Sequence, residues 1–217
     1  MKRTSAAPDI DPEKLVRGFC PPMLAVLVDG IPPDETNWVY ELKYDGFRAI
    51  AASSVGRVAV ISRNGIDLAD RFPTVAASVS RLRGHQAVLD GEIVAVGKDG
   101  VPRFELLQRG QGTRTSYIVF DLLWLDGVDL REQPIEKRRE LLEKLLRRPP
   151  EGIELAGRIE SPARAALEAV ARLGWEGLIA KRRESRYESK RSKAWLKLKA
   201  IRAQELAIVG FTPASHS

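Results

Sequence analysis

Cysteine and histidine are almost absent from this sequence. Among its 217 residues, Cys20 is the single cysteine, and His85 and His216 are the two histidines. One cysteine cannot form an intramolecular disulfide, so a reducing, cytoplasmic environment is the default expectation. Structural zinc sites draw on several Cys and His ligands, and such a site is therefore not expected. A Ser-His-Asp triad is poorly supported for the same reason.

Long apolar runs are missing as well. No stretch approaches the roughly 20 apolar residues of a membrane-spanning helix, and residues 1–9 lack the apolar core of a signal peptide. We therefore expect no membrane partner. Residues 1–17 are mostly polar and are expected to form a loose N-terminal tail. With 44% hydrophobic residues, the chain can bury a core as one large domain or two subdomains.

Positive charge is in modest excess and unevenly spread. Lysine and arginine total 35 against 29 acidic residues, a formal charge of +6, which favours a polyanionic partner. The segment 181–202 holds ten of these cations and only two glutamates, a net charge of +8. A solvated protein surface explains such a run in the simplest case. The position of this run beside a strand expected to handle phosphates favours contacts with a nucleic-acid backbone.

Alternation of apolar and polar residues predicts a protein of mixed, largely antiparallel architecture. Helices are expected at 135–147, between Ser161-Pro162 and Gly174, and more weakly at 70–82, where capping residues and helical spacing occur. The fold class is therefore α+β, with mainly antiparallel sheets flanked by helices. Strands are predicted at 38–43, 46–53, 57–62, 87–96, 117–124, 153–159, 177–181, 194–199 and 205–211.

Lys43 is the most informative residue, because Lys43-Tyr44-Asp45-Gly46 directly follows the strand-like run 38–42. A lysine attacks phosphorus only as the neutral amine, whereas a free lysine titrates at about 10.4. Nearby cations and burial favour the neutral form. A triphosphate would also need cations around its oxygens and carboxylates to hold a metal.

Groups of this kind follow Lys43 along the chain: two arginines where predicted strands meet turns, and acids, an aromatic and lysines within or just before predicted strands. Period two places Lys197 and Lys199 on one face of their strand. Each group also has a plain structural explanation: a solvated lysine, an edge-strand acid, a core aromatic or a surface arginine before a turn. The candidates are Glu41, Arg48, Arg63, Glu92, Phe120, Glu176, Lys197 and Lys199.

These groups lie in five short motifs. The motifs are Glu-Leu-Lys-Tyr-Asp-Gly-Phe-Arg at 41–48, Leu-Asp-Gly-Glu-Ile-Val at 89–94, Phe-Asp-Leu-Leu at 120–123, Glu-Gly-Leu-Ile-Ala-Lys-Arg at 176–182 and Trp-Leu-Lys-Leu-Lys at 195–199. The ordered set resembles the adenylation domain of covalent nucleotidyltransferases, specifically the ATP-dependent DNA ligases. The closest resemblance is to the ligase domain of bacterial multifunctional end-joining ligases. The first motif alone is weak, but five motifs in order over about 20–211 are specific.

The resemblance implies a covalent-nucleotidyltransferase domain at 18–203. It also implies that residues 204–217 begin a truncated oligonucleotide-binding (OB-fold) domain, so that a complete C-terminal OB domain is not expected. In this family a lysine attacks the α-phosphorus of ATP, expels pyrophosphate and forms lysyl-AMP. The AMP passes to the 5′-phosphate of a DNA nick, and the 3′-hydroxyl then displaces it to seal the strand during DNA repair.

Each candidate residue acquires a role from this resemblance. Lys43 is the expected nucleophile, with nicked double-stranded DNA as the substrate. Glu41 would lie at the adenine edge, Arg48 and Glu92 at the ribose, and Phe120 on the adenine face. Glu92 and Glu176 would serve Mg²⁺ or Mn²⁺, Lys197 and Lys199 would hold the phosphates and favour the neutral amine, and Arg63 would meet the 5′-phosphate of the nick.

Two other functions remain open from the sequence. An RNA ligase or a capping-type guanylyltransferase shares the lysine chemistry, while a noncatalytic nucleic-acid-binding module would need only the basic residues. For the parent protein we expect a monomer acting at the nucleoid, with end-joining proteins or fused repair domains as partners.

Overall fold

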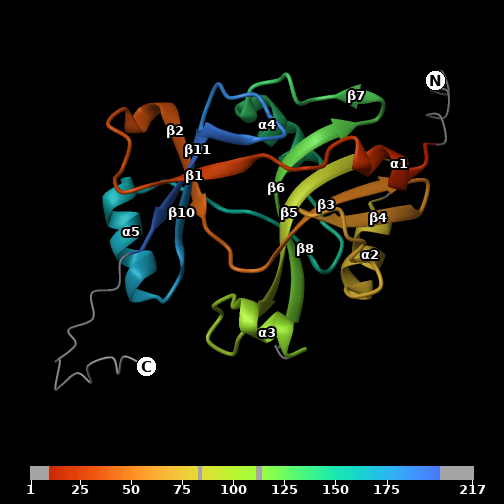
Figure 1. The fold of residues 1–217 in the computed structure, drawn as a ribbon, viewed down its shortest axis with the longest axis horizontal. Helices are drawn as coiled ribbons and strands as arrows, with labels where there is room; N and C mark the ends of the chain where they lie inside the picture. Colours follow the sequence, from red (N-terminus) through yellow and green to blue (C-terminus); the bar gives the residue numbers. More distant parts are fainter. Residues whose placement is uncertain (1–9, 83–84, 111–113, 201–217) are drawn as a thin grey trace, which may run out of the picture.

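The computed structural model describes residues 10–82, 85–110 and 114–200, and its strands form two sheets (Figure 1). The smaller sheet has the order β1-β11-β10-β2-β9 and the larger one β4-β3-β5-β6-β7, with β8 paired to β6. Neighbours are antiparallel except β1 with β11 and β6 with β8. The strands are β1 (Leu24–Val28), β2 (Trp38–Leu42), β3 (Phe47–Ser54), β4 (Arg57–Ser62), β5 (Ala87–Val96), β6 (Arg114–Leu125), β7 (Val128–Asp129), β8 (Ile153–Leu155), β9 (Arg158–Ile159), β10 (Gly177–Arg182) and β11 (Arg191–Lys199).

Short helices cover the outer faces of these sheets. Figure 1 shows α5 beside the smaller sheet, and α1 and α2 beside the larger one. No helix of the described residues is long and apolar enough to cross a membrane. The helices are α1 (Pro12–Arg17), the 3₁₀ turn η1 (Glu35–Asn37), α2 (Pro73–Ser80), α3 (Phe104–Gln108), α4 (Ile135–Leu145) and α5 (Ala163–Arg172).

The larger sheet is buried on both faces, as the alternation along β3 shows. Ala49 and Ala51 face a core with α2 and α4, while Ile50 and Ala52 face a second core that includes Trp195 of β11. The second core thus joins the two sheets. A third core packs α5 against the smaller sheet. Burial of each large apolar side chain contributes about 1.5–3 kcal/mol, so the three cores dominate folding.

The α+β, mainly antiparallel architecture predicted from the sequence is confirmed, and the strands at 38–42, 57–62 and 87–96 are nearly as expected. The strand predicted at 153–159 is wrong as a single element. It divides into β8, which pairs with β6 of the larger sheet, and β9, which pairs with β2 of the smaller one. The strand predicted at 205–211 lies outside the described residues.

Two local expectations also need correction. Helix α1 occupies part of the segment expected to be a loose tail, because Asp11 caps it and Val16 is fully buried in the second core. Helix α5 begins at Ala163 without a side-chain cap from Ser161. Instead, Glu35 Oε2 accepts a hydrogen bond from the Ala163 amide at 3.2 Å. Neither β1 nor α3 was predicted, since both are short and owe their order to tertiary packing.

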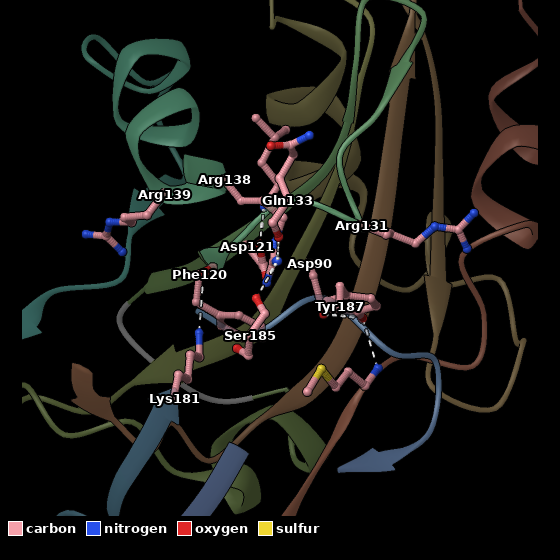
Figure 2. A network of polar contacts seen from close by, with 12 residues as sticks. Asp90, Phe120, Asp121, Arg131, Gln133, Arg138, Arg139, Lys181, Ser185 and Tyr187 are labelled. Carbon is pink, nitrogen blue, oxygen red and sulfur yellow. Dashed lines mark hydrogen bonds and ion pairs between the residues drawn. The ribbon is translucent and has the colours of Figure 1, made fainter. Parts of the chain in front are cut away.

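A buried ion pair connects α4, β6 and the β10–β11 connection (Figure 2). Arg138 donates from Nε and Nη2 to the two carboxylate oxygens of Asp121, both at 2.8 Å. Its Nη1 donates to the carbonyls of Gln133 at 2.5 Å and Ser185 at 3.1 Å. Both charged side chains are buried, so each depends on the other for compensation.

We expect Arg138→Met to lower the unfolding free energy by about 3–5 kcal/mol, because Asp121 would remain buried without its counter-charge. Lys144→Met on the same helix is the control. Lys144 pairs with Glu140 in solvent, so its replacement should cost less than about 1 kcal/mol. Urea unfolding followed by circular dichroism measures both. Equal losses in the two variants would contradict the structural importance of the buried pair.

Candidate active site

A cavity opens between the two sheets and collects most of the predicted residues. Seven of the nine candidates line it, and Glu176 and Lys199 do not. These seven residues come from five strands and two turns and converge on one space. The seven are Glu41, Lys43, Arg48, Arg63, Glu92, Phe120 and Lys197.

Strand register fixes the position of Lys43. Strand β2 is antiparallel to β10, with Leu42 opposite Leu178, and the Lys43 amide donates to the Gly177 carbonyl at 2.9 Å. Lys43 is thereby placed beside Glu176, and its ammonium group forms an ion pair with that carboxylate at the cavity edge. Gly177 has a φ of 148°, and a Cβ there would lie 2.0 Å from the Leu198 carbonyl oxygen, so only glycine fits this approach.

Glu92 reaches the same cavity from β5. A Cβ on Gly46 would lie 2.1 Å from the Ile93 carbonyl oxygen, so glycine lets the turn after Lys43 cross β5 closely. Burial raises the pKa of Glu92 to about 7, although the charges of Arg48 and Lys43 oppose this shift. A carboxyl group of this kind gains or loses its proton near neutral pH.

Glu41 lies deeper and is matched by a lysine to which the sequence analysis gave no role. Lys181 Nζ donates to Glu41 Oε2 at 2.7 Å and to the Phe120 carbonyl at 3.3 Å, and both charged side chains are buried. Burial lowers the pKa of Lys181, although the negative charge of Glu41 opposes this shift. Alternation along β10 places Lys181 on the same side as Ile179, which also lines the cavity. This alternation is the feature of the sequence that could have identified Lys181 as a cavity residue.

Phe120 is both a core residue and part of the cavity wall. Its ring is 8% exposed. The Arg48 guanidinium carbon lies 4.3 Å from the ring centroid, and Lys181 Nζ lies 4.4 Å from it. Trp195 packs edge-on against the same ring at 6.1 Å. The ring is thus held between neighbours that include two cations, each within cation–π distance.

The two lysines of β11 have different surroundings. Lys197 lines the cavity, and its pKa is lowered by partial burial and by the charges of Lys43 and Arg191. Lys199 is exposed and borders a separate groove beside α5. Period two therefore placed the pair on one strand face correctly, but the cavity reaches only the first of them.

Arg63 stands exposed at the cavity rim, where its amide donates to the Arg48 carbonyl at 3.2 Å.

In the basic stretch that begins at Lys181, fewer cations are available to a partner than the net charge of +8 suggested. Lys181 is buried against Glu41, and three further cations pair with carboxylates. These pairs are Arg183 with Glu136, Arg186 with Glu132 and Lys190 with Glu188.

Within the described part of the chain, no group of three or more His, Cys, Asp or Glu side chains is placed to hold a metal ion. Mg²⁺ in phosphate-handling sites needs only one or two protein carboxylates, because phosphates and waters complete its octahedron. Glu92 and Glu176 suit that arrangement and not a resident metal cage.

Comparison with known proteins gives one consistent result. Residues 22–199 match the family model described as the ATP dependent DNA ligase domain. The multifunctional non-homologous end joining protein LigD of Pseudomonas aeruginosa is 39% identical, over 88% of this chain and 23% of its own length. Its counterpart from Mycobacterium tuberculosis strain H37Rv is 37% identical, over 88% and 25%. This chain thus spans about a quarter of those relatives.

Solved structures agree with the sequence comparisons. A mycobacterial DNA ligase D complexed with ATP and MES has a TM-score of 0.75 at 36% identity, over 82% of this chain and 59% of that one. The ligase domain of LigD from M. tuberculosis has a TM-score of 0.73 at 35% identity, over 82% and 60%. Chlorella virus DNA ligase-adenylate, with a TM-score of 0.61 at 19% identity over 83% and 67%, shares the fold.

The raised pKa of Glu92 predicts a pH-dependent stability. The folded state holds this proton more tightly than the unfolded state, so the unfolding free energy must fall as pH rises from about 4.5 to about 7. Glu92→Gln should reduce this fall by on the order of 2 kcal/mol. Urea unfolding across this range, in a chelator and without nucleotide, measures it. The exposed Glu160→Gln serves as the control and should keep the wild-type slope; an unchanged slope in Glu92→Gln would contradict the assignment.

Proposed function

This chain belongs to the ATP-dependent DNA ligase domain family, and from that premise we propose that it binds ATP in the cavity between its sheets and transfers AMP to Lys43. The supporting observation is the convergence on one cavity of a lysine nucleophile, cations for the phosphates and a carboxylate. Neither a surface lysine nor an edge-strand acid would need such an arrangement. The plain structural explanations are therefore weakened for the seven cavity residues.

The proposed step forms one bond and breaks one. The nitrogen of Lys43 bonds to the α-phosphorus of ATP, the bond from that phosphorus to the pyrophosphate oxygen breaks, and the amine gives up a proton. Glu176 already contacts the ammonium group and is the nearest acceptor for that proton. Lys197 lines the same cavity as Lys43 and would offer a cation to the phosphates. Lys199 lies outside the cavity and is therefore less well placed to contact the phosphates.

Glu92 and Glu176 are the residues that would hold Mg²⁺ or Mn²⁺ together with phosphate oxygens. Such an ion would neutralise charge on the phosphates and polarise the α-phosphorus. Glu92 lines the cavity from β5, whereas Glu176, just before β10, reaches its edge through the ion pair with Lys43. They are therefore suited to a cation that arrives with its nucleotide.

Recognition of the base would involve Glu41, Lys181 and Phe120. The Watson–Crick edge of adenine offers an amino group beside a ring-nitrogen acceptor, which matches a carboxylate acceptor beside an ammonium donor. Guanine presents a carbonyl and an N–H in those positions, so its pattern is reversed. The Phe120 ring supplies a stacking surface, and Arg48 and Glu92 lie where the ribose would follow.

For the parent protein, we propose sealing of nicked double-stranded DNA during end joining, in the cytoplasm at the nucleoid. Two relatives carry names that state non-homologous end joining, and this supports the proposal. Arg63 at the cavity rim would meet the 5′-phosphate of the nick. Arg182 and Lys193 are exposed and have no ion pair among the described residues, so they are better placed for phosphate contacts than their paired neighbours. End-joining proteins or fused repair domains would be the partners of a monomer.

Incubation with ATP and Mg²⁺ or Mn²⁺ should add the mass of one AMP to the chain, and excess GTP should neither compete nor label it. Intact-mass spectrometry measures both results. A GMP adduct would instead favour a capping-type guanylyltransferase. Binding of nucleic acid without any nucleotide adduct would favour the noncatalytic module.

Glu176→Ala should slow AMP labelling by about tenfold or more, equivalent to ~1.4 kcal/mol in the barrier, because Lys43 loses its proton acceptor and the metal loses a ligand. Glu160→Ala, an exposed glutamate before α5, is the control and should label at the wild-type rate. Rates come from intact mass against time, with circular dichroism to verify the fold. A rate for Glu176→Ala within about twofold of wild type, ~0.4 kcal/mol, would refute this role.

A further inference from the structure

Tyr187 lies outside the cavity but forms a hydrogen bond with Asp90, the residue that holds Arg48 at the cavity wall. It belongs to the connection between β10 and β11 and is only 4% exposed. Its hydroxyl donates to Asp90 Oδ2 at 2.6 Å and accepts a hydrogen bond from the Met23 amide at 3.0 Å. Figure 2 shows the tyrosine beside Asp90, in the same polar layer as Arg138 and Asp121. The sequence analysis gave Tyr187 no role.

Asp90 in turn holds Arg48. Its Oδ1 accepts from Arg48 Nε at 2.5 Å and its Oδ2 from Nη2 at 2.6 Å, a bidentate geometry that fixes the plane of the guanidinium. That plane lies over Phe120 and borders the cavity. Arg48 Nη1 has no protein partner among the described residues, so it remains available to a ligand. Arg48 Nη2 also donates to the Met23 carbonyl at 3.3 Å, so the two short bonds to Asp90, supported by this longer one, set the orientation in which Arg48 meets the cavity.

The tyrosine hydroxyl determines which orientation Asp90 takes. The aspartate is fully buried, and Oδ2 receives both Arg48 and Tyr187. Without the hydroxyl, Oδ2 would keep only one donor, and the Met23 amide would lose its acceptor. Of the hydrogen bonds to this carboxylate, only those from Arg48 would then remain.

Resting on the proposed binding of ATP in the cavity, we infer that Tyr187 is a positioning residue: through Asp90 it fixes the Arg48 guanidinium at the cavity wall. It thereby couples nucleotide affinity to the anchoring of the β10–β11 connection. Tyr187 is not among the residues that line the cavity, and its main link to Arg48 runs through the aspartate.

The connection itself is held at several points near Tyr187. The Tyr187 amide donates to the Arg131 carbonyl at 2.8 Å, the Glu188 amide donates to Met23 Sδ at 3.3 Å, and Arg138 donates to the Ser185 carbonyl. Exposed Arg183, Arg186 and Lys190 project from this anchored segment. Because coupling between two sites is reciprocal, nucleotide that engages Arg48 must also stabilise this connection.

The first test compares two hydroxyl deletions. Tyr187→Phe removes the bond to Asp90 and keeps the ring against Trp195. Tyr117→Phe, the matched control, removes an equally buried hydroxyl that donates to the Ala49 and Leu89 carbonyls at 3.0 and 3.1 Å. The probe is α,β-methylene ATP, which binds without nucleotide transfer, and calorimetric titration gives its Kd.

We expect Tyr187→Phe to weaken binding about fivefold or more, ~1 kcal/mol, and Tyr117→Phe to stay within about twofold of wild type. Equal Kd values for Tyr187→Phe and wild type would overturn the inference, as would equal weakening in both variants. If wild type binds the analogue and Tyr187→Phe binds it equally well, the positioning role fails while the proposed function stands. Absence of analogue binding to wild type would refute both.

The second test needs no variant. Hydrogen exchange of the wild-type chain, with and without saturating α,β-methylene ATP, should show slower exchange at the amides of Ser185, Tyr187 and Glu188. The turn amides of Gly97 and Gly100, which bond only within their own turn, serve as the control and should not change. Unchanged exchange at the connection on saturation would contradict the coupling.

Discussion

The antiparallel register of β2, β10 and β11 is the constraint on which the site depends. Leu42 pairs with Leu178 and Ile179 with Lys197, so the chain after Leu42 must meet Gly177 and Glu176. The same register directs Glu41, Lys181 and Lys197 toward the larger sheet. A slip of one residue in any of these strands would turn its cavity side chains to the opposite face. Lys43 would then lose its carboxylate partner and its neighbouring cation together.

Buried pairs of opposite charge next to these strands fix the positions of the site residues. Each pair costs free energy because its charges lose their hydration. Lys181 with Glu41, Arg48 with Asp90 and Arg138 with Asp121 each place opposite charges out of water. Such pairs contribute little net stability compared with apolar packing, but loss of one partner is severe. Their value here lies in orientation. Each pair joins two different elements, and two of the three border the proposed nucleotide site directly.

Much of the site could be predicted because its chemistry occupies short, ordered motifs at strand ends. Lys43 and Arg63 are charges next to turns, Glu92 is a carboxylate that interrupts an apolar strand, and the cavity includes all three. Lys199 could not be separated from Lys197, since both share a strand face and only tertiary packing ends the cavity. The acids that neutralise the basic stretch, such as Glu132 and Glu136, lie some 50 residues away from it in sequence. Pairing at that distance has no local signal.

The elements of the fold also divide into those that the local sequence predicts and those that depend on contacts distant in sequence. Strands β3 to β6 have strong alternation or continuous apolar runs, and the sequence identified them. Strand β1 was missed because its order comes from parallel pairing with β11, more than 160 residues later. Residues 153–159 look like one strand because nothing local marks the point where the chain leaves one sheet for the other. Helix α1 is a single capped turn and a half whose stability comes from Val16 in the core.

The central claim is that Lys43 carries the nucleotide, and the most direct measurement is peptide mapping by tandem mass spectrometry after incubation with ATP and Mg²⁺. The account predicts one AMP, on Lys43, and no adduct in a Lys43→Ala variant that retains native circular dichroism. An adduct mapped to Lys181 or Lys197, or one that persists in Lys43→Ala, would contradict it.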